Sequence, residues 1–392
     1  MNKTIKIAIY SGAVSSTTFI ERLIKGLAVN GYQIVIFGFR NKKVSSVTNI
    51  HYFTYAGKLS KFFQLIKYSF LLSVFKFKDK KKLDAIIYKR KNNSRLLKVK
   101  YYPVLYHRPD IFHLQWAKGI EDWIWVQEFG MKLILSLRGT HITISPNAND
   151  NWSDLYSKYF PEIDGFHAVS KSMIVEALKY GALASKINVI YSGLDLEQFH
   201  FSSKTNKIET LNILSVGRTH WTKGYAHAFD AFKILKNKGT KFHYTIVGVK
   251  NDEELLFQRS QLDLENEVTF IGELSFDEVL EAIKKADVLL LSSVEEGIAN
   301  VVLEAMALGT LVVSTDCGGM NEVIFDDKNG FIVPVRNSKA LALTLEKVAQ
   351  MSLSEYQKLT KAARVAIEQQ HNSKKMATEM QDLYQNVLNN EL

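Results

Sequence analysis

The chain has 392 residues, which at about 150 residues per domain suggests two domains or three. Hydrophobic residues make up 46% and charged residues 23%, a composition that excludes a disordered or fibrous chain. The single cysteine, Cys317, excludes an intrachain disulfide and a cysteine-based metal cluster. The apolar run at residues 7–10 is too short for a signal-peptide core, and no stretch approaches the ~20 apolar residues of a membrane span. We therefore expect a cytoplasmic protein.

The net charge of +10 comes from one part of the chain. Residues 58–103 hold 14 basic residues and two acidic ones, Asp79 and Asp84, with phenylalanines and leucines between the lysines. Such a helix is suited to a membrane interface, with its lysines toward lipid head groups, so we expect peripheral contact with an anionic membrane on its inner face. The alternative is a pair of core helices with a solvated basic loop. No nucleic-acid motif accompanies the patch, and no nucleic-acid partner is expected.

In chain order, the pattern predicts a strand at residues 3–10, a polar loop, a helix at residues 17–29 that stops at Gly31, and a strand at residues 32–37. Further predicted strands of the first half lie at 111–114, 132–137, 165–169 and 188–191, with helices between them. The second half repeats the alternation, with predicted strands at 211–216, 242–247, 268–271, 288–291, 311–314 and 331–333.

This alternation predicts an α/β protein with two doubly wound, Rossmann-like domains built on parallel sheets. The polar residues 202–207 are the predicted linker. We expect an N-terminal domain at 1–200, a second domain at 201–370, and a C-terminal helix at 371–392 that crosses back onto the first domain. Ligands of such domains bind beyond the carboxyl ends of the strands, so the loops there are the candidate sites.

Two loops of the second half carry the chemistry. After the strand at 211–216, Gly217 allows a sharp turn, and Arg218 and Lys223 bring two positive charges that suit a diphosphate. After the strand at 288–291 comes a helix that is apolar on nearly every side except at Glu304. We interpret Asn300 as its N-cap and Gly309 as its stop. A buried glutamate needs a partner, which is either a ligand or a protein cation such as Arg218 or Lys223.

These residues resemble a known family. Glu296 and Glu304 are separated by seven residues, with Gly297 after the first and Gly318-Gly319 further on. The set resembles the Glu-x7-Glu signature of the family 4 retaining glycosyltransferases, which have the GT-B fold with two domains facing a central cleft. The likeness runs in order from about residue 5 to about residue 350.

The resemblance implies a donor site for a nucleotide diphosphate sugar. Glu304 would hold the ribose, Glu296 would contact the sugar, and Arg218 and Lys223 would hold the diphosphate and offset leaving-group charge. The remaining implied donor contacts are Gly217, Val249, Phe270, Gly272, Gly297, Ile298, Ala299 and Asn300. The resemblance also implies transfer without a metal or other cofactor, and the chain has no Asp-x-Asp.

The first domain would bind the acceptor, and here the chain departs from the family. Many members have a histidine after the strand that matches 132–137, whereas this chain has Arg138, with His141 three residues later. An arginine can stabilise a phosphate or a sugar oxygen but is no general base at neutral pH. The implied acceptor contacts are Gly12, Ser15, Ser16, Thr17 and His113.

The sequence thus predicts a retaining, metal-independent hexosyltransferase-type glycosyltransferase. Its acceptor hydroxyl is expected on a lipid-linked or surface-polysaccharide glycan, as in lipopolysaccharide biosynthesis. Two alternatives stay open, namely a non-catalytic nucleotide-sugar or glycan binding protein of GT-B fold and a GT-B nucleotide-sugar epimerase. For His113, a simple packing role is an equally good interpretation.

Overall fold

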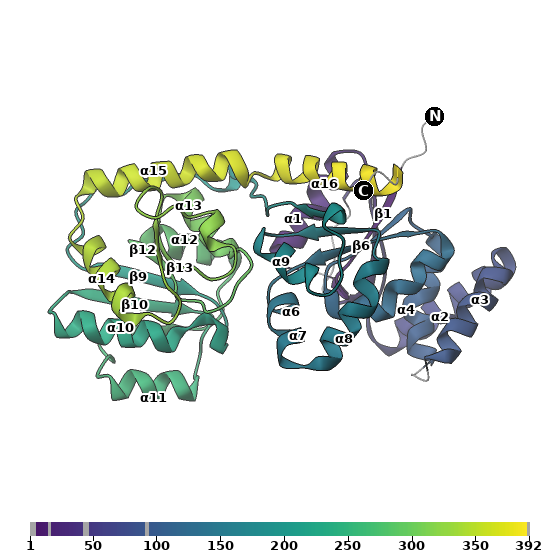
Figure 1. Cartoon of the computed structure of the whole chain (residues 1–392), viewed down its shortest axis with the longest axis horizontal. Coiled ribbons are helices and arrows are strands. Elements are labelled where there is room, and N and C mark those ends of the chain that lie inside the picture. The colour runs from purple at the N-terminus through teal and green to yellow at the C-terminus, as the bar shows by residue number, and fades with distance from the viewer. Residues whose placement is uncertain (1–4, 15–16, 42–46, 91–93, 390–392) are drawn as a thin grey trace. The chain divides into compact units, whose positions relative to one another are not determined.

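The computed structural model describes residues 5–14, 17–41, 47–90 and 94–389 and divides the chain into two compact units (Figure 1). Unit 1 comprises Met1–Val169, Met173–Ile190 and Ser373–Leu392, and unit 2 comprises Ser170–Ser172 and Tyr191–Asn372. The main division therefore lies at Ile190, earlier than the expected boundary after residue 200. The expected linker at 202–207 lies inside unit 2, where the Ser202 N–H donates to the Leu308 carbonyl (3.0 Å).

Unit 1 contains an eight-stranded parallel sheet in the order β2-β3-β1-β5-β6-β7-β8, with β4 paired to the outer side of β3. The sequence analysis missed β2 and β4, although the β-branched and aromatic residues of β4 favour a strand. The strands are β1 (Lys6–Tyr10), β2 (Ala13–Val14), β3 (Gln33–Arg40), β4 (Ile50–Tyr55), β5 (Ile111–Leu114), β6 (Lys132–Leu137), β7 (Gly165–Ala168) and β8 (Ile187–Val189).

The two faces of this sheet carry separate cores because successive side chains of a strand point to opposite faces. Ile7 and Ile9 face the core under α1 and α16, whereas Ala8 faces the core under the remaining helices. The helices of unit 1 are α1 (Thr18–Val29), α2 (Gly57–Phe75), α3 (Phe77–Lys89), α4 (Ser94–His107), α5 (Ile120–Trp123), α6 (Thr140–Thr143), α7 (Ser145–Ala148), α8 (Asp150–Tyr159), α9 (Ser172–Leu178) and α16 (Ser373–Asn389).

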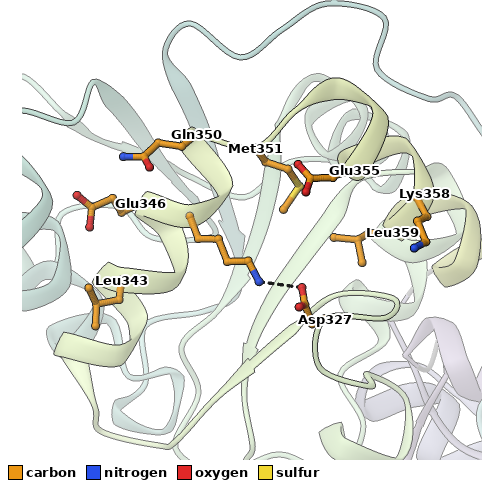
Figure 2. A pocket seen from close by; sticks show the side chains of 9 residues that line it. Asp327, Leu343, Glu346, Gln350, Met351, Glu355, Lys358 and Leu359 are labelled. Atoms are coloured by element: carbon orange, nitrogen blue, oxygen red, sulfur yellow. Dashed lines mark hydrogen bonds and ion pairs between the residues drawn. The ribbon is translucent and has the colours of Figure 1, made fainter.

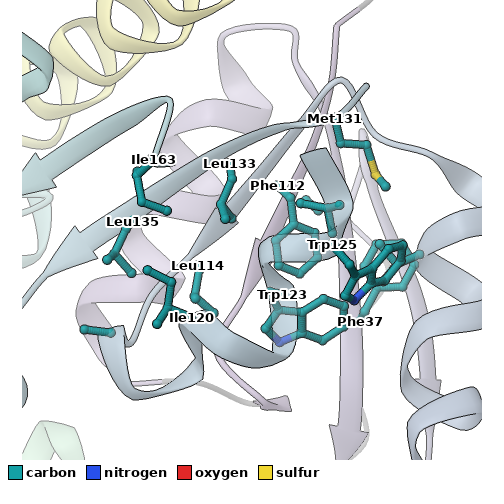
Figure 3. Packing of buried hydrophobic residues seen from close by; sticks show 14 of the residues in the cluster. Phe37, Phe112, Leu114, Ile120, Trp123, Trp125, Met131, Leu133, Leu135 and Ile163 are labelled. Carbon is teal, nitrogen blue, oxygen red and sulfur yellow. The ribbon is translucent and has the colours of Figure 1, made fainter. Parts of the chain in front are cut away.

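Aromatic side chains dominate the second of these cores (Figure 3). Trp123 stacks on Phe112 of β5 with ring centroids 4.5 Å apart, and Trp125 packs beside it. Both indoles are buried. This packing holds the carboxyl ends of β5 and β6 in place, and those ends carry the polar residues described below.

Unit 2 contains a six-stranded parallel sheet in the order β11-β10-β9-β12-β13-β14. The strand order reverses between β9 and β12, and ligands of doubly wound sheets bind at this switch point. The strands are β9 (Leu211–Val216), β10 (Phe242–Val247), β11 (Val268–Ile271), β12 (Val288–Leu291), β13 (Leu311–Thr315) and β14 (Phe331–Val333). The helices are α10 (Tyr225–Asn237), α11 (Glu253–Gln261), α12 (Phe276–Lys285), α13 (Asn300–Leu308), α14 (Ser338–Ala349) and α15 (Leu353–Gln370).

Candidate functional site

Glycines bring the loops after β9 and β10 together at the switch point. A Cβ on Gly217 would lie 2.9 Å from the Lys223 side chain, and one on Gly248 would lie 2.9 Å from the Gly217 carbonyl oxygen. The Gly217 N–H donates to the Val247 carbonyl at 2.9 Å. Larger residues would push these loops apart, so the glycines allow the two loops to approach each other closely.

An ion pair joins the loop after β9 to the loop after β12. Lys223 Nζ lies 2.5 Å from Glu296 Oε1, and the side chains are only 20% and 22% exposed. Gly224, at φ +64°, makes this approach feasible because a Cβ there would lie 2.1 Å from the Ser292 carbonyl oxygen. Ser293 Oγ also donates to Glu296 Oε1 at 3.3 Å. Glu296 is thus held by two groups at the switch point, and Lys223 pairs with it rather than with Glu304.

The helix α13 begins beside this ion pair. Its N-cap is Ala299, which has no side chain that can cap the helix, so the prediction of Asn300 as N-cap is wrong. Asn300 is instead the first helical residue, and its buried Oδ1 has no hydrogen-bond partner among the described residues. Gly309, at φ +93°, ends the helix as predicted. Glu304 is 6% exposed, as the apolar surroundings in the sequence suggested.

The glycine pair after β13 supports the same loop. A Cβ on Gly318, at φ +57°, would lie 1.7 Å from the Glu296 carbonyl oxygen. The Gly319 N–H donates to the Gly297 carbonyl at 2.7 Å. Because they lack side chains, these glycines let the segment after β13 pack directly against the loop at 296–300. The hydrogen bond then holds the two segments together.

The other expected donor contacts differ in accessibility. Arg218 is exposed, and it makes no ion pair with any residue that the structure describes. Val249 is fully buried in the core, so a contact between its side chain and a nucleotide base is excluded by the structure. Phe270 and Gly272 instead border a hollow of about 470 Å³ beside Lys250.

A second hollow of unit 2 was not predicted from the sequence. It has a volume of about 500 Å³ and lies at the same edge of the sheet, beside the loop after β9. Its wall includes His220, the exposed Trp221 and Arg336. In the sequence, Trp221 in an otherwise polar loop was the feature that could have indicated this hollow.

A third hollow, of about 580 Å³, lies at the opposite edge of the sheet (Figure 2). Residues from the end of α14 and the start of α15 line it, and an ion pair between Lys347 and Asp327 crosses it. It is distant from the carboxyl ends of the strands, where ligands of this architecture bind.

Unit 1 has its own polar cluster, at the carboxyl ends of β5 and β6. Arg138 Nη2 donates to Gln115 Oε1 at 3.3 Å, and the guanidinium lies 4.5 Å from the Phe19 ring centroid. His141, from α6, packs against Trp116. Gln115, Phe19 and Trp116 were not among the expected site residues, and only the positions of Gln115 and Trp116 just after a strand could have indicated them.

Three polar atoms of this cluster are buried without a hydrogen-bond partner among the described residues, namely Gln115 Nε2, Arg138 Nε and His141 Nδ1. Because orphaned buried polar groups are rare, a ligand is a natural partner for them. Desolvation lowers the pKa of Arg138 to about 9, so the guanidinium stays charged at neutral pH. Burial, with a smaller effect of Lys118, lowers the pKa of His141 to about 4, which makes it a neutral donor or acceptor rather than a strong base.

His113 lies deeper, beneath this cluster's partly exposed members Trp116, Arg138 and His141. It is fully buried, with Nδ1 2.7 Å from Tyr384 Oη of α16 and Nε2 2.8 Å from Ser136 Oγ. Both ring nitrogens are therefore occupied, and a direct acceptor contact is excluded by the burial. The side chain instead ties the C-terminal helix to the sheet of unit 1.

The expected acceptor loop is described only in part. Gly12 has φ +88°, and its carbonyl accepts from the Phe39 N–H at 3.2 Å. Thr17 is exposed and precedes α1 without capping it through its side chain. Ser15 and Ser16 lie outside the described residues. Among the residues that are described, no group of three histidine, cysteine or acidic side chains is placed to hold a metal ion.

Two parallel α/β sheets, each with helices on both faces, define the class of fold. The chain has the GT-B fold, as the sequence predicted, and solved GT-B glycosyltransferase structures match it over nearly their whole length. One of them is Alr3699/HepE of Anabaena in complex with UDP-glucose, with a TM-score of 0.72 at 15% identity over 97% of this chain and 100% of that chain. At this identity the likeness shows the fold alone.

Sequence comparison also finds similarity to glycosyltransferases. A family model described as "Glycosyl transferases group 1" matches residues 197–366, all of which lie in unit 2. The chain is 31% identical over 224 residues to the amylovoran biosynthesis glycosyltransferase AmsK of Erwinia amylovora, covering 55% of each chain. It is 32% identical over 243 residues to the putative colanic acid biosynthesis glycosyltransferase WcaL of Escherichia coli (strain K12), covering 60% of each. The chain thus matches little more than half the length of these relatives.

Proposed function

We propose that the protein is a retaining glycosyltransferase that moves a sugar from a nucleotide diphosphate sugar to an acceptor hydroxyl in polysaccharide or lipopolysaccharide biosynthesis. The observation that carries the proposal is the Lys223–Glu296 ion pair at the switch point of unit 2, next to a helix start without a side-chain cap. A cation, a carboxylate and a helix N-terminus in one place match the phosphates and hydroxyls of such a donor.

The diphosphate would bind between Arg218 and Lys223. Lys223 would exchange its contact with Glu296 for a phosphate oxygen, and the exposed Arg218 would close on the other side. The N–H groups at the start of α13 add positive potential in the same direction. These charges stabilise the departing nucleoside diphosphate in the transition state, the task that a metal ion performs in other enzymes.

The two glutamates would then divide the rest of the donor between them. Glu304, buried within α13, would accept hydrogen bonds from the ribose hydroxyls, which a carboxylate can accept in pairs. Glu296, released from Lys223, would accept from the hydroxyls of the donor sugar, with the backbone of residues 297–300 beside it. Phe270 and Gly272 would flank the base.

In the reaction, the bond between the anomeric carbon and the phosphate oxygen breaks, and a bond from the acceptor oxygen to the anomeric carbon forms. Retention is compatible with attack on the face of the leaving group or with two successive displacements. In the first route the acceptor's proton passes to the departing phosphate. Arg138, which stays charged at neutral pH, would stabilise an oxygen of the acceptor sugar during transfer.

The acceptor is proposed to be a glycan of a surface polysaccharide or a lipid-linked precursor. The relatives named in amylovoran and colanic acid biosynthesis support this class of product. His141 and Trp116 in unit 1, both partly exposed, offer a hydrogen-bonding group and a ring face, the combination by which proteins bind sugars.

The experiment is a thermal-shift screen with UDP, GDP, ADP and their sugars on the wild type and on Glu304→Gln, followed by turnover with the donor that binds. A stabilising nucleotide whose effect falls in the variant is the expected result. NMR of the product must then show the anomeric configuration of the donor.

The outcomes separate the alternatives. Tight sugar-nucleotide binding without transfer to any glycan acceptor would indicate a binding protein, and conversion of the donor without an acceptor would indicate an epimerase. An absence of any shift at millimolar nucleotide, in a folded protein, would overturn the donor site.

A further inference from the structure

One helix of unit 1 presents an apolar face to solvent. Along α2, Leu59, Phe63, Ile66, Phe70 and Val74 are 51% to 76% exposed. Their spacing of four, three, four and four residues places them on one side of the helix, and we call them the α2 stripe. Other large apolar side chains exposed in this segment are Phe62 and Phe75 of α2 and Phe77 of α3.

The opposite side of α2 already packs into the core of unit 1. Tyr68 and Leu72 are buried there, and Leu65 packs against the same cluster. The helix is therefore apolar on two sides, a pattern typical of helices that are covered all round. A contiguous exposed apolar surface of this kind marks an interaction site.

Positive charge without ion-pair partners among the described residues lies on α2 and on the next helix. Lys58 and Lys67 lie on α2, and Lys78 and Lys81 follow on α3; all four are exposed, and none forms an ion pair with a described residue. The acidic residues of the segment are already engaged. Asp79 pairs with Arg108, and the partners of Asp84 are Lys80 and Lys98. The surface thus combines exposed apolar side chains with positive charge that no described acidic residue neutralises.

The rest of the basic segment is organised differently. In α4, Tyr101, Tyr102 and Leu105 are buried, and Lys98 and Lys100 form ion pairs with Asp84 and Asp122. The structure therefore narrows the expected surface at 58–103 to α2 and the start of α3. It also overturns the simpler alternative of two core helices with a solvated basic loop, because the stripe is in solvent.

A groove continues the stripe into the unit. It has a volume of about 830 Å³ and runs between β4 and α2, lined by Tyr52 and Phe53 on one side and Leu59, Phe63 and Ile66 on the other. An apolar partner that covers the α2 stripe would also reach this groove. Among the described residues, no helix is both long and apolar enough to cross a membrane.

We propose that the α2 stripe docks this protein on an anionic lipid surface. The phenylalanines insert at the boundary of head groups and acyl chains, and Lys58, Lys67, Lys78 and Lys81 contact the lipid phosphates. Both parts are needed, since a few inserted side chains or a few lysines alone bind a membrane only weakly. This inference is independent of glycosyl transfer, because the proposed donor contacts of the nucleotide all lie in unit 2.

The test is flotation of the full chain with vesicles of phosphatidylcholine and phosphatidylglycerol, compared with phosphatidylcholine alone. We expect binding to the anionic vesicles that falls at high salt. The double variant Phe63→Ser with Phe70→Ser should bind at least about tenfold more weakly. Replacing the four lysines by glutamine should abolish the preference for anionic vesicles and the effect of salt.

Controls come from unit 2. Phe257→Ser removes one phenylalanine of similar exposure from α11, and glutamine at Lys285, Lys328, Lys339 and Lys361 removes four exposed lysines. Both control variants should bind vesicles like the wild type. A nucleotide-induced thermal shift and circular dichroism report on folding of all variants, and they also keep a failure of the donor site distinct from a failure of docking.

Two results would overturn the proposal. One is a wild type that does not float with anionic vesicles, or whose flotation the stripe variant leaves unchanged. The other is a wild-type dimer that the stripe variant dissociates without any vesicle binding, which would make the stripe an interface between copies.

Discussion

Lys223 Nζ lies 2.5 Å from Glu296 Oε1, and this pair joins the loops that follow β9 and β12. In the proposed donor complex, Lys223 would exchange Glu296 for a phosphate oxygen, and Glu296 would exchange Lys223 for a sugar hydroxyl. Without a donor, the ion pair would hold both side chains at the switch point.

Lys223→Met should weaken binding of the nucleoside diphosphate by roughly tenfold or more, because a charge-assisted hydrogen bond to phosphate contributes about 1.5–3 kcal/mol. Isothermal titration with the nucleotide that passes the thermal-shift screen measures the change. The control is Lys238→Met, which breaks a similar ion pair with Glu346 away from the switch point. Equal affinities of the two variants would contradict a phosphate contact by Lys223.

Glu304→Gln should weaken binding of the nucleotide but leave binding of inorganic pyrophosphate unchanged. The reason is that Glu304 is proposed to contact the ribose, whereas Arg218 and Lys223 contact the phosphates. Competition titrations with pyrophosphate on both variants separate the roles. A loss of pyrophosphate affinity in Glu304→Gln would place this carboxylate elsewhere or indicate a general disturbance of α13.

Gly224→Ala should destabilise unit 2 by about 2 kcal/mol or more and lower its melting temperature by several degrees. Gly224 has φ +64°, and a Cβ would lie 2.1 Å from the Ser292 carbonyl oxygen. The control is Gly239→Ala, whose φ of +79° is also left-handed but whose Cβ would meet nothing within 4 Å. That variant should lose only about 1 kcal/mol, the cost of the backbone conformation itself. Similar losses in the two would refute the close approach of the loops.

Stability of unit 1 should fall as the pH falls below about 6.5, the ordinary pKa of histidine in an unfolded chain. Burial lowers the pKa of His167 to about 3 and that of His113 well below its usual value. Between the lowered pKa values of the folded chain and about pH 6.5, the histidines bind protons in the unfolded chain but not in the folded one. Each histidine then removes up to about 1.4 kcal/mol of the free energy of unfolding per pH unit.

The measurement is the melting temperature from about pH 7 to about pH 5 for the wild type, His167→Gln and His51→Gln. The His167 variant should show a shallower decline. His51 is at the surface, and its variant should follow the wild type. A decline in His167→Gln as steep as in the wild type would show that other groups govern the acid sensitivity.

Many elements were predictable because their signals are local. The strands at 111–114, 132–137, 211–216, 242–247, 268–271, 288–291 and 331–333 have the predicted bounds, since continuous apolar runs between turn residues identify strands of buried parallel sheets. The strand at 50–55 was missed because it lies at a sheet edge, where the pattern is only partly apolar. The helix start at Asn300 was misassigned because capping depends on backbone geometry rather than on residue type.

The candidate site was only partly predictable. Arg218 and Lys223 could be proposed because ligands bind in the loops after parallel strands, and Glu304 because a carboxylate in an apolar helix needs a partner. Glu296 could be proposed only from the resemblance to the Glu-x7-Glu signature. No pattern in the chain could show that Val249 and His113 would be buried, or that Gln115 would lie beside Arg138. Those facts depend on which strands become neighbours and on which helix covers them.

By itself, the sequence determined the alternation of strands and helices, which predicts two doubly wound domains, and the order of charged and glycine-rich loops; the GT-B fold was implied by the family resemblance. These depend on side-chain periodicity and on backbone preferences within a few residues. Only the tertiary structure decided that Lys223 pairs with Glu296, that His113 binds Tyr384 of the C-terminal helix, and that the α2 stripe stays in solvent. Such contacts join residues far apart in the chain, and they form only when loop closure has brought those residues together and close packing has selected one arrangement.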